Sequence, residues 1–87
     1  MYSPEFDEGW KKYFNKLPEE IKPMIAKKIK RILEGLLSRH LMYGLDYFVE
    51  EVGQHRICYK SFEDKKIRRF YFVGVHKEYD KWRKALL

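Results

Sequence analysis

Residues 53–82 read GQHRICYKSFEDKKIRRFYFVGVHKEYDKW, and this stretch decides the fold. A period of two is typical of β-strands, and it is read here over two segments. In the first, Ile57 and Tyr59 alternate with Arg56, Cys58 and Lys60; in the second, Ile67, Arg69, Tyr71 and Val73 alternate with Arg68, Phe70 and Phe72. The charged run 63–66 between them is short enough to be the turn of an antiparallel hairpin. Residues 70–73 are apolar on both faces, so we expect the second of these strands to lie inside a sheet.

A further strand and a terminal helix are predicted on either side of this hairpin. Side chains alternate over residues 45–50, and Val52-Gly53 supplies a turn that continues the meander. Gly74 ends the last strand, and residues 77–87 are predicted to form a short helix that carries Tyr79, Trp82 and Leu86.

The beginning of the chain is predicted to be helical. Ser3-Pro4-Glu5 has the chemistry of a helix start, because the hydroxyl can cap the first turn and proline suits it. Apolar residues then recur at spacings of three and four, which predicts a helix of roughly four turns. We expect this stripe to be core rather than a surface that stacks bases; its members are Phe6, Trp10, Tyr13, Phe14 and Leu17.

A second helix is predicted after the break at Leu17-Pro18. Pro18-Glu19-Glu20 repeats the start chemistry, and Pro23 predicts an irregular first turn. The helical pattern stops near residues 38–40, and its apolar stripe is Ile25, Ile29, Ile32, Leu33 and Leu36. Two helices with so short a break should form an antiparallel hairpin.

These elements predict an α+β fold in one domain, residues 1–87. The N-terminal helical hairpin should pack on one face of a three- to four-stranded antiparallel sheet, followed by a short C-terminal helix. A chain of 87 residues allows a single modest core, and an aromatic content of 17% means that rings supply much of it.

The net charge of +6 is concentrated in the C-terminal part. Residues 1–52 hold nine basic and nine acidic side chains, whereas residues 53–87 hold ten basic and four acidic ones. This asymmetry favours a polyanionic partner, and the alternative is a solvated lysine-rich surface. The basic residues that we predict to bind substrate are Lys60, Arg68 and Lys77.

Several classes of protein are excluded by the sequence. No apolar run approaches the ~20 residues of a membrane span, and residues 1–17 do not read as a signal peptide, so we expect a cytoplasmic protein. Cys58 is the only cysteine and is predicted to be a reduced core residue. One cysteine and three scattered histidines give no zinc-ligand spacing, and no metal or other cofactor is expected.

Arg56 and His76 are the residues most suited to chemistry, and both fall at strand ends. Cleavage of RNA by its own 2′-hydroxyl needs a base, positive charge on the phosphorane-like transition state, and an acid for the leaving oxygen. Arginine suits the charge, and histidine suits the acid or the base. Arg56 could instead pair with Glu50 or Glu51, and His76 could cap the terminal helix. The general base stays open among Glu50, Glu51, His40 and His55.

The chain resembles the RelE/ParE toxin superfamily of type II toxin–antitoxin systems. The resemblance rests on the order of elements, on FxxGWKKxFxKLPEEIK at 6–22, on HRICY at 55–59 and on VGVHKEY at 73–79. It implies an endoribonuclease that cleaves mRNA in the ribosomal A site and is blocked by a cognate antitoxin. The same superfamily includes gyrase inhibitors, and an inactive member is a third reading.

Site roles follow from this resemblance residue by residue. Arg56 would hold the scissile phosphate, His76 would donate or accept a proton, and Tyr79 or Trp82 would stack on a base. Some members place lysines in the strand before the arginine, where this chain has YFVEE at 47–51 and no lysine.

Overall fold

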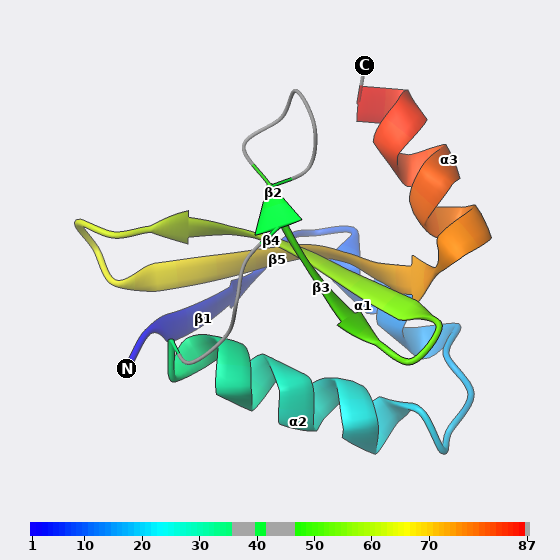
Figure 1. Ribbon diagram of the computed structural model, residues 1–87, viewed down its shortest axis with the longest axis horizontal. Helices are drawn as coiled ribbons and strands as arrows, with labels where there is room; N and C mark the ends of the chain where they lie inside the picture. Colours follow the sequence, from blue (N-terminus) through cyan, green and yellow to red (C-terminus); the bar gives the residue numbers. More distant parts are fainter. Residues whose placement is uncertain (36–39, 42–46, 87) are drawn as a thin grey trace.

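The computed structural model describes residues 1–35, 40–41 and 47–86. These residues contain five strands and three helices. The strands form one sheet in the order β1-β5-β4-β3-β2, and helices lie on both sides of it (Figure 1). The predicted α+β fold is confirmed. In chain order the elements are β1 (Ser3–Phe6), α1 (Trp10–Asn15), α2 (Lys22–Leu33), β2 (His40–Leu41), β3 (Phe48–Val52), β4 (His55–Phe62), β5 (Ile67–Val75) and α3 (His76–Leu86).

The sheet is mixed rather than purely antiparallel. The predicted meander of β3, β4 and β5 is present, but β1 runs parallel to β5, with Ser3 paired to Ile67 and Phe6 to Phe70. The prediction of a helix beginning at Ser3 is therefore wrong, and α1 has only six residues. Pro4 is tolerated in β1 because this strand lies at the sheet edge, where a missing N–H leaves no ladder bond unmade.

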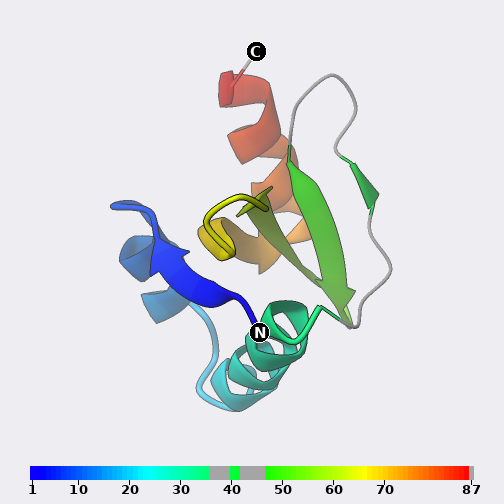
Figure 2. The same ribbon diagram turned by 90° about the vertical axis from the view of Figure 1, so that its left-hand side faces the viewer.

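The helices cover opposite faces of the sheet. In Figures 1 and 2, α2 lies below the sheet and α3 lies above it. The first core, between the sheet and α1 and α2, contains Trp10, Leu17, Ile25, Ile32, Ile57, Tyr59, Phe70 and Val73. The second core, under α3, contains Val49, Cys58, Phe72 and Tyr79. The N-terminal helices α1 and α2 thus pack on one face of the sheet, as predicted, and α3 packs on the other.

A register shift in β5 explains how the rings of Phe70 and Phe72, two residues apart, reach different cores. Cys58 pairs with Phe72 and Tyr59 pairs with Phe70, so Tyr71 is the extra residue of a bulge. The strict alternation predicted over 67–73 is therefore broken at Tyr71. As a result, Phe70 packs in the first core and Phe72 in the second.

Helix α2 follows its predicted stripe but is shorter at both ends. It begins at Lys22 with Pro23 in the first turn, and it ends at Leu33. Gly35 adopts a φ of 76°, a left-handed conformation typical of the residue after a helix. The predicted continuation through Leu36 to residue 39, and Leu45 and Asp46 of the predicted strand, lie outside the described residues.

Arg68 is part of the scaffold, which does not fit its predicted role in binding substrate. Its side chain is 4% exposed, and its Nη1 donates to the Ile32 carbonyl at 2.6 Å. Its Nε donates to Ser61 Oγ at 3.0 Å, and the guanidinium lies 3.8 Å from the Tyr2 ring centroid. Arg68 thus ties the end of α2 to the β4–β5 hairpin and to the N-terminus.

We predict that Arg68→Ala lowers the free energy of unfolding by about 2–4 kcal/mol, because it leaves buried acceptors without their charged donor. Arg69→Ala is the matched control. Arg69 is 29% exposed and pairs with Glu5 and Asp7 at the surface, so its loss should cost about 1 kcal/mol or less. Urea denaturation followed by circular dichroism measures both, and equal midpoints for the two variants would contradict the assignment.

Candidate functional site

Arg56 and His76 line one hollow of about 310 Å³ at the end of the sheet. The β4–β5 register places Arg56 opposite Gly74, two residues before His76. Two neighbouring strands therefore deliver the guanidinium and the imidazole to the same place, with Lys77 beside them. Among the described residues its lining is Glu51, Gly53, Gln54, Arg56, Val75, His76 and Lys77. We call it the catalytic hollow below, after the two residues that the sequence analysis predicts to be catalytic.

Two glycines shape this end of the sheet. Gly53 opens the two-residue turn between β3 and β4 with a φ of 59°, a conformation that glycine adopts without strain. At Gly74, a Cβ atom would lie 2.8 Å from Cζ of Phe72, a ring held in the second core. A side chain at residue 74 would therefore displace packed core atoms just before the strand turns into α3.

Arg56 is held by two neighbours. Its Nη2 lies 3.5 Å from Glu51 Oε2, so the ion pair considered from the sequence is present with Glu51. Its guanidinium lies 4.8 Å from the ring centroid of Tyr79, whose pKa is raised chiefly by burial, so the phenol stays neutral. The Arg56 side chain is 26% exposed, and an exposed pair of this kind is weak enough for a phosphate to replace the carboxylate.

His76 opens α3 and reaches solvent. Its side chain is 62% exposed, and Nε2 lies 3.1 Å from Oδ2 of Asp80, one turn further along the helix. A carboxylate that accepts a hydrogen bond from Nε2 holds the ring in place and leaves Nδ1 as the ring nitrogen that can serve a ligand. Asp80 was missed from the sequence, although the i, i+4 spacing of a histidine and an aspartate on a predicted helix is readable there.

The other residues predicted to bind substrate lie in different places, some at the surface and some packed onto the sheet. Lys77 lines the catalytic hollow, whereas Lys60 lies further along the same face, with Nζ 4.7 Å from the ring centroid of Tyr47. Tyr79 is 7% exposed and belongs to the second core, which does not fit a role in stacking on a base. Trp82 is half-buried and stacks on Phe72 at 5.2 Å, so it also packs onto the sheet.

The structure narrows the choice of general base. Glu51 lines the catalytic hollow. Glu50, in contrast, is 5% exposed, and its Oε1 lies 3.9 Å from Nζ of Lys28. His55 lines a different hollow on the other side of β4, and the side chain of His40 lies outside the described residues. Among the three candidates whose side chains the structure describes, Glu51 is the one that lines the same hollow as Arg56.

Cys58 is a core residue, as predicted. It is fully buried, and burial raises the pKa of its thiol, so it stays protonated and unreactive. Within the described ranges, no three histidine, cysteine, aspartate or glutamate side chains gather as a metal site. Over the same residues, each helix is too short or too polar to cross a membrane.

Comparison with known proteins identifies the fold through solved structures. No family model and no curated protein matches the chain. The isolated Escherichia coli RelE toxin is 22% identical with a TM-score of 0.75, and all of each chain is covered. The Mycobacterium tuberculosis RelBE2 toxin–antitoxin complex is 16% identical with a TM-score of 0.76, and the match covers 86% of this chain and 91% of that one. The Methanococcus jannaschii RelB–RelE complex is 18% identical with a TM-score of 0.72, and the match covers 90% of this chain and 96% of that one. At these identities the likeness concerns architecture, and the chain has the fold of the RelE toxins.

Proposed function

We propose that this chain is the toxin of a type II toxin–antitoxin pair and cleaves mRNA on the ribosome. The observation that carries the proposal is the catalytic hollow, which gathers Arg56, His76, Lys77 and Glu51 at one end of a RelE-like fold. A guanidinium, an imidazole and a carboxylate can supply the positive charge, the acid and the base that RNA cleavage through the 2′-hydroxyl requires.

Each group has one step in the proposed reaction. Glu51 removes the proton of the 2′-hydroxyl, and that oxygen attacks the adjacent phosphorus. Arg56 stabilises the charge that develops on the non-bridging oxygens, because its fork donates two hydrogen bonds to a phosphate. The bond from phosphorus to O5′ then breaks, and His76 protonates O5′. The products are a 2′,3′-cyclic phosphate and a 5′-hydroxyl.

The proposed partners follow from charge and from the architecture. The basic excess in residues 53–87 favours ribosomal and messenger RNA, with Lys77 the basic side chain that adjoins His76 in the hollow. An antitoxin is proposed because the solved neighbours include complexes of RelE with RelB. The protein would act in the cytoplasm, where its ribosomal target is found.

The test uses purified protein with ribosomes programmed by a defined mRNA. We expect fragments with 5′-hydroxyl and 2′,3′-cyclic phosphate ends, and no cutting of the same mRNA without ribosomes. A DNA gyrase supercoiling assay runs in parallel. Inhibited supercoiling without fragments would replace the proposal with a gyrase inhibitor, and neither activity would leave an inactive protein with a toxin fold.

A further inference from the structure

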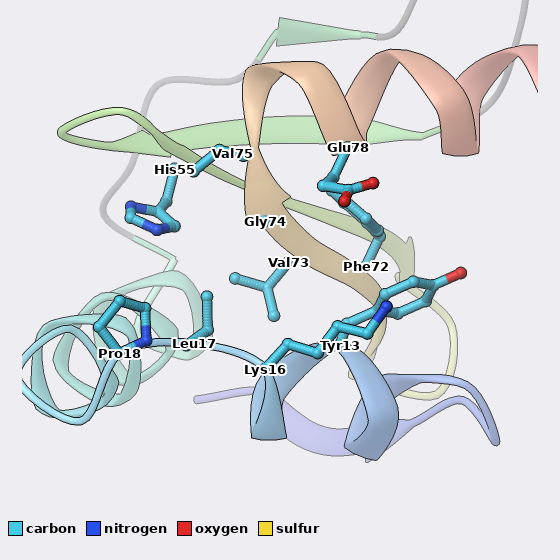
Figure 3. A pocket seen from close by; sticks show the side chains of 10 residues that line it. All are labelled: Tyr13, Lys16, Leu17, Pro18, His55, Phe72, Val73, Gly74, Val75 and Glu78. Carbon is cyan, nitrogen blue, oxygen red and sulfur yellow. The ribbon is translucent and has the colours of Figure 1, made fainter.

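A second hollow, of about 440 Å³, lies between the end of α1, the end of β5 and the start of α3 (Figure 3). It is called the α1 hollow below. Its volume falls within the range of small-molecule sites. Among the described residues its lining is Tyr13, Lys16, Leu17, Pro18, His55, Phe72, Val73, Gly74, Val75 and Glu78.

The α1 hollow has apolar walls that the cores hold in place. Leu17 and Val73 are buried in the first core, and Phe72 is buried in the second. The Tyr13 ring meets the Phe72 ring edge-on, with the two centroids 4.8 Å apart. A ligand ring that enters this hollow would therefore contact preformed apolar and aromatic surface, as in most small-molecule sites.

Two opposite charges border these walls. Lys16 comes from the end of α1, and Glu78 comes from the first turn of α3. In Figure 3, Glu78 lies above Val73 and Lys16 below it, with both charged ends to its right. Within the part of the chain that the structure describes, Lys16 forms no ion pair, and Glu78 has only a weak exposed pair with Lys81 at 4.0 Å. Both charges are therefore available to a ligand.

We propose that the α1 hollow binds a free aromatic α-amino acid, phenylalanine or tyrosine; this inference goes beyond the proposed function and does not depend on it. The carboxylate of the ligand pairs with Lys16 and its ammonium group pairs with Glu78. Its ring lies against Phe72 and Val73. His55 is half-buried on the other side of Val73 from the two charges, and its ring nitrogens can bond a tyrosine hydroxyl.

Other classes of small molecule leave one of the two charges without a partner. A carboxylic acid that lacks an amino group brings no donor to Glu78, and an amine that lacks a carboxylate brings no acceptor to Lys16. A nucleotide would place its phosphate charge beside the carboxylate of Glu78. A charged group that loses water on binding and gains no partner costs affinity, so a zwitterion with an apolar ring suits this hollow best.

Binding is tested on the full chain by NMR, with 13C-labelled methyl groups of leucine and valine and with L-phenylalanine as the probe. We expect L-phenylalanine to shift the methyl signals of Leu17 and Val73. L-Phenylalaninamide lacks the carboxylate, and N-acetyl-L-phenylalanine lacks the ammonium group. Each of these two should bind about 10-fold more weakly, because each loses one charge-assisted contact.

Two variants assign the two charges to their partners. Lys16→Gln should bind L-phenylalanine and its amide with affinities within about 2-fold of each other, because the partner of the carboxylate is gone. Glu78→Gln should bind L-phenylalanine and N-acetyl-L-phenylalanine within about 2-fold, because the partner of the ammonium group is gone. Lys11→Gln and Glu34→Gln are the matched controls and should keep both preferences, since Lys11 and Glu34 are exposed and outside the lining of the hollow.

Three results would overturn the inference. The first is no shift of the Leu17 and Val73 signals, or equal affinity of the wild-type protein for all three probes. The second is equally tight binding of N-acetyl-phenylalanine amide, which would assign the hollow to an aromatic side chain of a protein partner. The third is a shift confined to Val75, which also lines the catalytic hollow and would place the ligand there. The mRNA cleavage assay is independent of these measurements, so either proposal can fail alone.

Discussion

Arg56→Ala should slow ribosome-dependent mRNA cleavage by about 10²–10³-fold, the usual cost of removing one donor that stabilises developing charge. In the structure, the guanidinium lies over the Tyr79 ring at 4.8 Å and within 3.5 Å of Glu51, so it is already oriented in the catalytic hollow. Alanine removes the group that stabilises the negative charge on the phosphorane. The rate of appearance of 5′-hydroxyl ends, measured at saturating ribosomes, reports this step.

Two further variants make the Arg56 result specific. Arg31→Ala removes the same charge from an exposed position on α2, so it controls for weaker general attraction to RNA and should cut at the wild-type rate. Arg56→Lys keeps the charge but not the two-pronged hydrogen bonding, and an intermediate rate is expected. The surface pair with Glu51 contributes little to stability, so all three proteins should melt together. An Arg56→Ala rate within about 3-fold of wild type would refute the role of Arg56.

The convergence of Arg56 and His76 was predictable because it depends on strand order and turn length. The hairpin signals in residues 53–75 fix an antiparallel pair, and such a pair places the start of β4 beside the end of β5. The role of Arg68 was not predictable in the same way. It looks like any other cation in the sequence, and its burial follows from a bond to the Ile32 carbonyl, 36 residues away.

The errors in the fold share one cause, which is that local patterns were outweighed by distant partners. Ser3-Pro4-Glu5 carries the chemistry of a helix start, yet the exposed edge of β5 pairs with this segment as a strand. Likewise, a regular alternation was predicted for β5, but a bulge at Tyr71 interrupts it. The bulge places Phe70 and Phe72 in different cores. That bulge gives α3 its own apolar surface, and α3 carries His76.

His76→Ala should slow cleavage by about 10²–10⁴-fold, the range expected for loss of a positioned general acid. His76 is 62% exposed at the mouth of the catalytic hollow, and Asp80 holds its Nε2 at 3.1 Å. Asp80→Asn should have a smaller effect, about 10-fold, because the ring keeps its chemistry and loses its fixed orientation. Lys81→Ala controls for changes on the same helix, since Lys81 is exposed and outside the lining of either hollow.

A modified substrate distinguishes an acid from a base at this position. When sulfur replaces the bridging O5′ at the cut site, the departing thiolate needs no proton. If His76 is the general acid, His76→Ala should cut this substrate at nearly the wild-type rate, whereas Arg56→Ala stays slow because charge still develops on the phosphorus. If the sulfur substrate does not restore cutting by His76→Ala, the imidazole acts instead as the base that deprotonates the 2′-hydroxyl. Glu51 would then be left as a partner of Arg56 and not the base.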